Sequence, residues 1–243
     1  MGDSSRKWQY LIVTLVLVSV ALTGCLYPDE RRAENQMPST FFLEQTQKAI
    51  DQFRADTSVL PIVTKDMNTP IFEKYEIEFR KLIPKYLPDA PGNAFEKGGV
   101  YKYVLIDVET NPAVRLIHLP SVSTVADVQR AIDSYRYQND DQLPIKADLG
   151  EGYFSIDFGK IGMKETQVPG TAGNYLLPLI MNGKGQVGID YAIDIATVLR
   201  ESEATVQERT DPRYVMARES NFVPAQSFPY TMDGDQPKLL KIK

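Results

Sequence analysis

The chain contains one cysteine and one histidine, and this scarcity limits the thiol and imidazole chemistry that the chain can perform. Cys25 stands directly after Leu22, Thr23 and Gly24, so its nucleophilic thiol follows side chains small enough for a peptidase to accept. His118 is a candidate general acid or base. One histidine with one cysteine does not supply the several nitrogen and sulfur ligands of a zinc site. The sequence therefore indicates chemistry at Cys25 first and leaves His118 as the second candidate.

The residues before Cys25 have the regions of an export signal. Arg6 and Lys7 supply positive charge, and residues 10–22 are an apolar, uncharged run. That run is shorter than the ~20 residues of a transmembrane helix. The cysteine with the three residues before it resembles the bacterial lipobox, in which the thiol is acylated and the chain is cut in front of it. We expect residues 1–24 to be a lipoprotein signal peptide; the alternative is an uncleaved anchor helix.

The lipid expected on Cys25, a diacylglycerol with acyl chains, predicts where the chain resides. Two or more acyl chains hold a protein stably at a membrane, so we expect the outer face of the cytoplasmic membrane, with membrane lipid as a partner. Residues 25–38 read CLYPDERRAENQMP, and their charges and prolines predict a flexible tether. Removal of residues 1–24, which carry a net charge of +1, changes the net charge from −5 to −6. An acidic chain without a basic patch predicts no nucleic-acid partner.

The part that follows the tether has the pattern of an α+β fold. Apolar residues at helical spacing predict an amphipathic helix over about 40–55. Residues 99–108 are β-branched and aromatic, which predicts a strand, and alternation up to His118 predicts a second one. These elements form a first helix-plus-sheet unit, which we place at residues 39–120.

The second half repeats this order of elements. A helix is expected from Ser123 or Thr124 to Asn139, followed by strands over 152–158 and 187–195 and a short helix over 196–207. We place this second unit at residues 121–209. The prolines after Thr210 follow no period, which predicts an irregular C-terminal extension over 210–243.

The two predicted helices share more than amphipathic spacing. TQKAIDQFR at 46–54 and VQRAIDSYR at 128–136 agree in register, and Leu-Pro-Ile follows each of them, at 60–62 and 143–145. Amphipathicity fixes only the apolar positions, so the shared polar residues favour an internal duplication over chance. Weaker matches join Ile77-Glu78-Phe79 to Ile156-Asp157-Phe158, Gly92-Asn93 to Gly173-Asn174, and Ile106-Asp107-Val108 to Ile193-Asp194-Ile195. A different strand order in the two halves would contradict the duplication.

Part of each half resembles a known head domain. The segment AIDQFRADT at 49–57, with Leu60-Pro61, Tyr86-Leu87 and PGNAF at 91–95, is similar to the globular head of type II secretion pseudopilins. This resemblance covers about a third of the chain and implies a helix that leads into a small sheet. Pseudopilins begin with a prepilin-peptidase site and a long hydrophobic helix, which the lipobox replaces here, so filament assembly is not implied.

A second resemblance extends over nearly the whole chain. CLYP at 25–28, AENQ at 33–36, PGN at 91–93 and YVLIDVETNP at 103–112 resemble an uncharacterised lipoprotein family of Bacillus-type Gram-positive bacteria. That family has no assigned activity, so the resemblance implies a location and nothing about chemistry.

Two further groups of residues could do chemistry inside the folded part. His118 lies between Leu-Ile and Leu-Pro, a context typical of the end of a strand, and no nucleophile elbow of the Gly-x-Ser-x-Gly type accompanies it. Asn139, Asp140 and Asp141 offer oxygen ligands for Ca²⁺, but they lack EF-hand spacing and are typical of a polar helix exit. We therefore expect neither a catalytic residue nor a metal site.

These observations favour a non-enzymatic interaction or structural component of the cell envelope, with an envelope protein or a cell-wall component as its partner. The alternative is a solute- or peptide-binding lipoprotein that serves a transporter, which predicts a cleft between the two units. A third hypothesis is an enzyme that uses His118.

Overall fold

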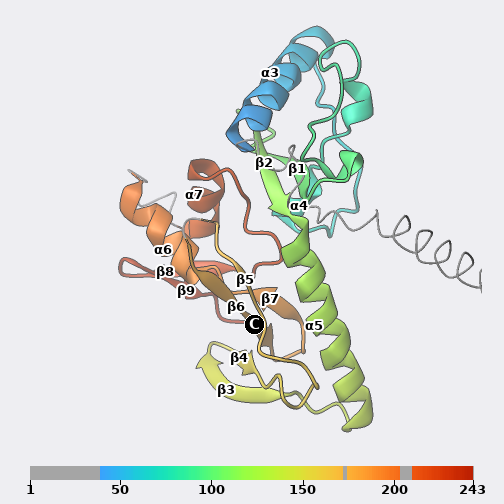
Figure 1. The fold of residues 1–243 in the computed structure, drawn as a ribbon. Helices are drawn as coiled ribbons and strands as arrows, with labels where there is room; N and C mark the ends of the chain where they lie inside the picture. Colours follow the sequence, from blue (N-terminus) through green and yellow to red (C-terminus); the bar gives the residue numbers. More distant parts are fainter. Residues whose placement is uncertain (1–38, 172–173, 203–209, 243) are drawn as a thin grey trace, which may run out of the picture. The chain divides into compact units, whose positions relative to one another are not determined.

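The computed structural model describes residues 39–171, 174–202 and 210–242. The predicted signal peptide, the lipobox residues Leu22, Thr23, Gly24 and Cys25, and the tether lie outside the described residues. The described chain is an α+β fold of helices and antiparallel sheets (Figure 1). No helix in the described part is both long and apolar enough to cross a membrane.

The first half begins with helix α3 (Ser39–Thr57) and ends with the ribbon of β1 (Tyr101–Ile106) and β2 (Ala113–His118). Between them lie the short helices α4 (Ile71–Lys74), η2 (Phe79–Lys81) and η3 (Phe95–Lys97). The predicted helix and both strands are therefore confirmed in type and position. Alternate residues of the ribbon pack on opposite sides, so that one face covers α3 and the other faces α7 (Pro212–Glu219).

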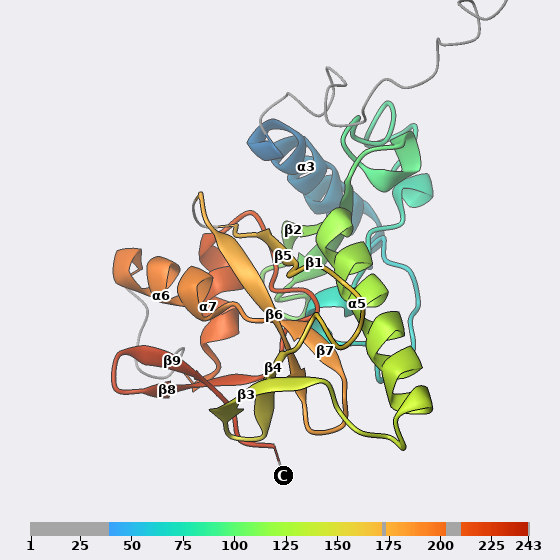
Figure 2. The ribbon, with the colours of Figure 1, turned by 60° about the horizontal axis from the view of Figure 1, so that its bottom comes forward.

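The second half consists of helix α5 (Leu119–Gln138) and a five-stranded antiparallel sheet. Its strands are β3 (Ile145–Gly150), β4 (Tyr153–Ile156), β5 (Gln167–Pro169), β6 (Leu176–Asn182) and β7 (Val187–Ile189). Helix α5 lies on one side of this sheet, and α6 (Ala192–Glu201) lies on the other with α7 (Figures 1 and 2). A single apolar core joins the sheet to all three helices.

Three predicted boundaries are wrong. Helix α5 begins at Leu119 rather than near Ser123, because Pro120 is well tolerated in a first helical turn. The predicted strand 187–195 is cut short at Ile189, and α6 starts at Ala192, where the Asp190 carboxylate accepts the Ala192 N–H at 3.0 Å. Strand β6 was not predicted at all.

Residues 210–242 differ from the irregular extension that we expected. They form helix α7, then an extended strap (residues 221–228), then a hairpin of β8 (Tyr230–Asp233) and β9 (Gln236–Leu239). Asp211 caps α7 by accepting the Arg213 N–H at 3.2 Å, and Pro212 occupies its first turn. Of the four prolines that gave this region an irregular appearance, Pro212 lies in the first turn of α7 and Pro224 in the strap, while Pro229 directly precedes β8 and Pro237 lies within β9.

The strap pairs with the outer edge of both β2 and β7. Leu116 N–H donates to Asn221 O at 2.9 Å, and Val223 N–H donates to Leu116 O at 3.1 Å. Farther along, Ile189 N–H donates to Gln226 O at 2.9 Å. One segment thus extends the β-structure of the first half and then that of the second.

In the first half, a side-chain amide ties the helix to the turn of the ribbon. Gln47 of α3 donates from Nε2 to Pro112 O at 3.0 Å, and its Oε1 accepts the Val114 N–H at 2.8 Å. Both partners are backbone groups two residues apart. This bidentate contact fixes where the ribbon starts its second strand against α3.

In the second half, Gln129 of α5 makes the same pair of contacts. It donates from Nε2 to Gly185 O at 2.9 Å, and its Oε1 accepts the Val187 N–H at 2.7 Å. The two glutamines are the residues that the aligned segments 46–54 and 128–136 place in register. We call the two contacts the glutamine clamps.

The connections after the helices also correspond. Glu78 N–H donates to Pro61 O at 2.7 Å, and Asp157 N–H donates to Pro144 O at 2.7 Å. In contrast, the proposed match of 106–108 with 193–195 is wrong, because the first segment ends β1 and the second lies in α6. The match of Gly92-Asn93 to Gly173-Asn174 includes Gly173, which lies outside the described residues.

Candidate functional site

The candidate site is a cavity of about 170 Å³ where the two halves and the strap meet. The first half contributes Tyr101, at the start of β1, and His118, at the end of β2. Thr171 and Tyr191 come from the second half, and Phe222 comes from the strap. These residues are far apart in sequence, so the cavity exists only when all three parts are assembled.

His118 and Ser121 form the polar corner of the cavity. His118 immediately precedes α5, and Ser121 lies in the first turn of that helix, so their side chains meet across one turn. The distance from His118 Nδ1 to Ser121 Oγ is 2.8 Å, and Ser121 is only 7% exposed. The pair therefore places a hydrogen-bonded hydroxyl group in a largely buried position.

Aromatic rings form the wall beside this corner. The Tyr101 ring lies 5.8 Å from the His118 ring and 5.8 Å from the Phe222 ring, both measured between centroids, with tilted planes. Such tilted contacts are favourable because ring edges meet ring faces. The wall therefore joins the first half to the strap.

The opposite wall is held by a buried carboxylate. Asp194 of α6 is fully buried and accepts hydrogen bonds from Thr171, at 2.9 Å from N–H and 2.8 Å from Oγ1. The Tyr175 hydroxyl group also donates to Asp194. These contacts fix the loop that carries Thr171 at the edge of the cavity.

Burial and carboxylates raise the pKa of three tyrosines near this wall. Burial, followed by the hydrogen bond to Asp194, raises the pKa of Tyr175 to about 12. Burial is also the main cause of the raised pKa of Tyr191 and of Tyr230, which donates to Asp190 at 2.6 Å. All three phenols are therefore neutral at ordinary pH.

The walls occupy corresponding places in the two halves. His118 precedes α5 as Tyr191 precedes α6, and Ser121 and Asp194 each follow three residues later. Both pairs stand after a strand whose outer edge bonds to the strap. The starts of α5 and α6 thus both lie next to the cavity, with different side chains.

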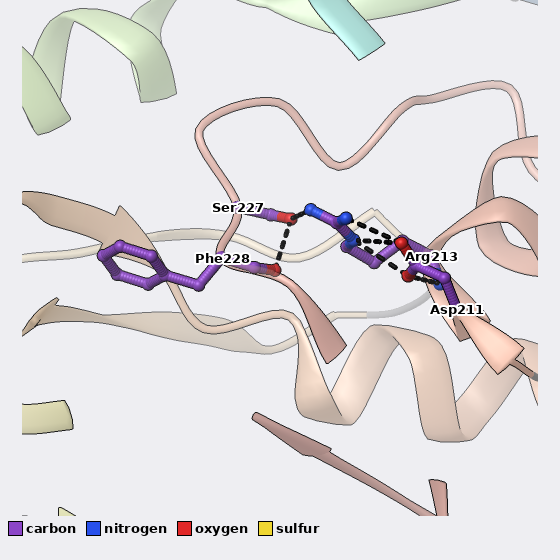
Figure 3. A network of polar contacts seen from close by, with 4 residues as sticks. All are labelled: Asp211, Arg213, Ser227 and Phe228. Atoms are coloured by element: carbon purple, nitrogen blue, oxygen red, sulfur yellow. Dashed lines mark hydrogen bonds and ion pairs between the residues drawn. The ribbon is translucent and has the colours of Figure 1, made fainter. Parts of the chain in front are cut away.

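The far end of the strap is anchored by a polar network (Figure 3). The Arg213 guanidinium donates to both carboxylate oxygens of Asp211, with the shortest contact at 2.6 Å, and to Ser227 Oγ at 3.3 Å. Ser227 Oγ in turn donates to Phe228 O at 3.0 Å. Arg213 also lies over the Phe72 ring, at 5.4 Å from its centroid. The strap is therefore fixed to the start of α7 next to the first half.

The other sequence candidates lie elsewhere. Asp141 pairs with Arg136 at 2.5 Å, and the Asn139 amide donates to Tyr135 O at 2.8 Å, which are the contacts of a helix exit. No group of three or more His, Cys, Asp or Glu residues with metal-site geometry occurs within the described ranges. The candidate calcium loop and the cavity are thus separate features.

The sequence identified His118 as a candidate site residue but not the residues that surround it in the structure. Ser121, Tyr191, Asp194 and Phe222 lie in segments interpreted as a helix approach, a strand and an irregular tail. The correspondence of His118 with Tyr191 and of Ser121 with Asp194 relative to the helix starts is visible only in the structure, and the sequence repeat did not contain it. Phe222 carries no sequence signal either.

The comparisons with known proteins concern the first half. Residues 39–118, from the first residue of α3 to the last of β2, match the model of the YphF family N-terminal domain. This stretch is therefore similar to that domain, whose family is uncharacterised. No curated protein matches the chain, and no solved structure matches it.

Proposed function

We propose that the chain is a lipoprotein, anchored through Cys25 at the outer face of the cytoplasmic membrane, whose folded body is a non-enzymatic interaction component of the cell envelope. The observation that carries the proposal is the order of a basic start, a short uncharged apolar run and Leu22-Thr23-Gly24-Cys25. The polar segment 25–38 gives the body reach away from the lipid.

The anchor is tested by the mass of the mature N-terminus. Expression in a Gram-positive host and mass spectrometry of the membrane fraction should give a chain that begins at diacylglyceryl-Cys25. A Cys25→Ser variant should remain uncut and should incorporate no labelled palmitate. An N-terminus upstream of residue 25 in the unmodified protein would disprove the anchor.

The body is proposed to consist of two related units. In the first half, the isolated antiparallel bridges Ile62–Ile77 and Glu76–Val104 lead to β1 and then β2; in the second half, β3, β4, β6 and β7 neighbour one another in the same sequence order, and β5 is an additional strand on β6. The two glutamine clamps and the paired contacts of Glu78 and Asp157 support the same view. The resemblance to a pseudopilin head stays a prediction, which an experimental structure of residues 39–118 would test.

The interaction role is tested by crosslinking in cells. The lipidated protein is crosslinked in the intact envelope, and the captured species are identified by mass spectrometry. A stoichiometric envelope protein or wall polymer supports the proposal, whereas a transporter permease favours the alternative function below. A His118→Ala variant that loses its biological activity but keeps its stability and its crosslinks would instead favour an enzyme.

A second candidate function is solute binding in service of a transporter. The cavity between the halves, with its buried hydroxyl and aromatic wall, is the specific observation that favours it. Its volume of about 170 Å³ lies below the ~300 Å³ at which most ligand pockets begin. Only a small solute therefore fits inside this cavity, and a peptide is too large to be enclosed in it completely.

A further inference from the structure

Two hollows beside the short helix α4 form a groove that is separate from the cavity at His118. The first hollow lies between α4, the end of β1 with the turn that follows it, and α7. The second lies between α4, the strap and the start of β7. Ile71 and Phe72 line both hollows, so the two adjoin along α4. We call this combined surface the α4 groove.

The α4 groove has a buried apolar floor and an exposed apolar side chain. Phe72 is 4% exposed and Ile106 is 5% exposed, and the Phe72 ring lies 5.0 Å from the Tyr214 ring between centroids. Ile71, which both hollows share, is 40% exposed. An apolar side chain that leaves water to cover these residues is stabilised by the hydrophobic effect. The groove therefore favours a partner that supplies an apolar side chain.

Most charged side chains that line the α4 groove are already paired. Arg218 donates from Nε to Asp107 at 2.7 Å, and Arg213 donates to Asp211 at 2.6 Å. The Glu73 carboxylate accepts the Gln226 N–H at 2.8 Å. These contacts also fix the walls, because they join α7 to the turn after β1 and α4 to the strap. A groove with fixed walls loses little conformational entropy when it binds a partner.

Glu109 is the exception among these charges. It is exposed in the turn after β1, it lines the first hollow, and within the described ranges its carboxylate has no hydrogen bond or ion pair. The Lys74 ammonium group lies 5.8 Å from the centroid of the Tyr75 ring and is not part of the lining. A cationic group of a partner therefore complements this edge of the groove, whereas an anionic group would be repelled.

The arrangement of the two hollows fits an elongated partner. They adjoin at α4, a helix of four residues, and a helix with its side chains is ~10 Å wide. Three residues of extended chain span about 10 Å. A short extended segment therefore reaches from one hollow to the other across Ile71.

We infer that the α4 groove is a docking surface for an extended polypeptide segment of an envelope protein, which covers Ile71 and Phe72 with an apolar side chain and places a Lys or Arg against Glu109. This inference rests on the proposed interaction role and names its surface and the kind of partner segment.

The test is photo-crosslinking of the full lipidated protein in intact cells. A benzophenone amino acid replaces Ile71 in one variant and Tyr137, which is 92% exposed on α5, in the matched control. The Ile71 position should give a discrete adduct at least fivefold above the control. Mass spectrometry of the adduct should identify a polypeptide with Lys or Arg within a few residues of an apolar crosslinked residue.

A charge variant then tests the contact at Glu109. Glu109→Lys should lower the yield of the Ile71 adduct at least threefold, because repulsion replaces attraction, and Glu109→Gln should lower it less. Glu165→Lys is the matched control, since Glu165 is exposed and lines neither hollow, and it should leave the yield unchanged. Melting temperatures establish that each variant is folded.

Four results would overturn the inference: no adduct at Ile71, an equal adduct at Tyr137, an adduct with lipid or wall polymer instead of a polypeptide, or an unchanged yield in a folded Glu109→Lys variant. A chemical crosslinker that reacts with lysines anywhere on the body reports on the proposed interaction role independently. A stoichiometric envelope protein captured in this way without an Ile71 adduct would leave the interaction role standing and reject the α4 groove. Loss of both signals would reject the interaction role as well.

Discussion

The two halves of the body share a backbone arrangement and differ where they face each other. Each half ties its first helix to the last two strands through a glutamine clamp, and each donates a backbone N–H to a proline carbonyl in the Leu-Pro-Ile segment. At the cavity the similarity ends: His118 and Ser121 stand at the start of α5, whereas Tyr191 and Asp194 stand at the start of α6. The backbone contacts within the two halves are thus alike, while the side chains next to the cavity differ.

The strap also contacts the two halves through different residues. Its contact with β7 requires Gly188, because a Cβ there would lie 2.6 Å from the Phe228 ring and 2.9 Å from Gln226 O. The corresponding residue of β2 is Arg115, whose guanidinium donates to Ala217 O at 2.6 Å at the end of α7. In the second half, the strap fits because residue 188 has no side chain. In the first half, the long side chain of Arg115 instead holds α7.

The largest expected effect tests whether the halves unfold together. Ile50 in α3 and Ile132 in α5 occupy matching core positions, and both are 0% exposed. Replacement of either with Ala should lower the free energy of unfolding by about 2–5 kcal/mol. In urea titrations followed by circular dichroism, both variants should shift one common transition. Two separate transitions would show that the strap does not couple the halves.

A smaller effect is expected at the glycine that admits the strap. Gly188→Ala forces the strap away from β7 and should cost about 1–3 kcal/mol of unfolding free energy. Gly183→Ala is the matched control, since its Cβ would meet no atom closer than 3.9 Å. Thermal unfolding should give a clearly lower melting temperature for Gly188→Ala than for Gly183→Ala. Equal melting temperatures would mean that the strap moves to make room for the added methyl group without a loss of stability.

The glutamine clamps provide the most direct comparison of the halves. Gln47→Ala and Gln129→Ala each leave a backbone N–H and a backbone carbonyl without their partner, at about 1–2 kcal/mol of unfolding free energy each. The double variant should show the sum, because the clamps share no residue. If one single variant lost much less unfolding free energy than the other, its glutamine clamp would contribute little to stability.

The smallest effect concerns alkaline pH. The pKa of Tyr175 is raised to about 12 in the folded chain, so its stabilising share is complete below pH 10 and is lost as the pH rises toward 12. The difference in melting temperature between the unmodified protein and Tyr175→Phe should therefore shrink over this range. Tyr137→Phe, at a side chain that is 92% exposed, serves as the control and should show no such trend.

Local patterns predicted some parts of this molecule well. Helix α3 follows from its apolar spacing, and β1 and β2 follow from their β-branched and aromatic composition. Strand β6 was not predicted because it contains Pro178, and proline is usually confined to sheet edges or strand ends. Helix α6 was misplaced because residues 187–195 have a β-like composition, although the helix starts at Ala192, whose N–H donates to the Asp190 carboxylate.

The cavity was less predictable than the fold. Its walls join residues of two halves and the strap, whose proximity depends on long-range pairing such as that of Leu116 with Asn221. Sequence spacing gives no measure of such contacts. The predicted repeat did not help, because it matched residues 106–108 with 193–195 and did not relate 118–121 to 191–194.

The strap also bears on the order in which the body is completed. Leu116 and Ile189 both bond to backbone that follows them by many residues, and a chain that emerges N-terminus first exposes these strand edges before their cover exists. Exposed edges are sites of aggregation. These two strand edges therefore stay uncovered until residues 221–228 have been made, and edge-to-edge aggregation is most favourable during that interval.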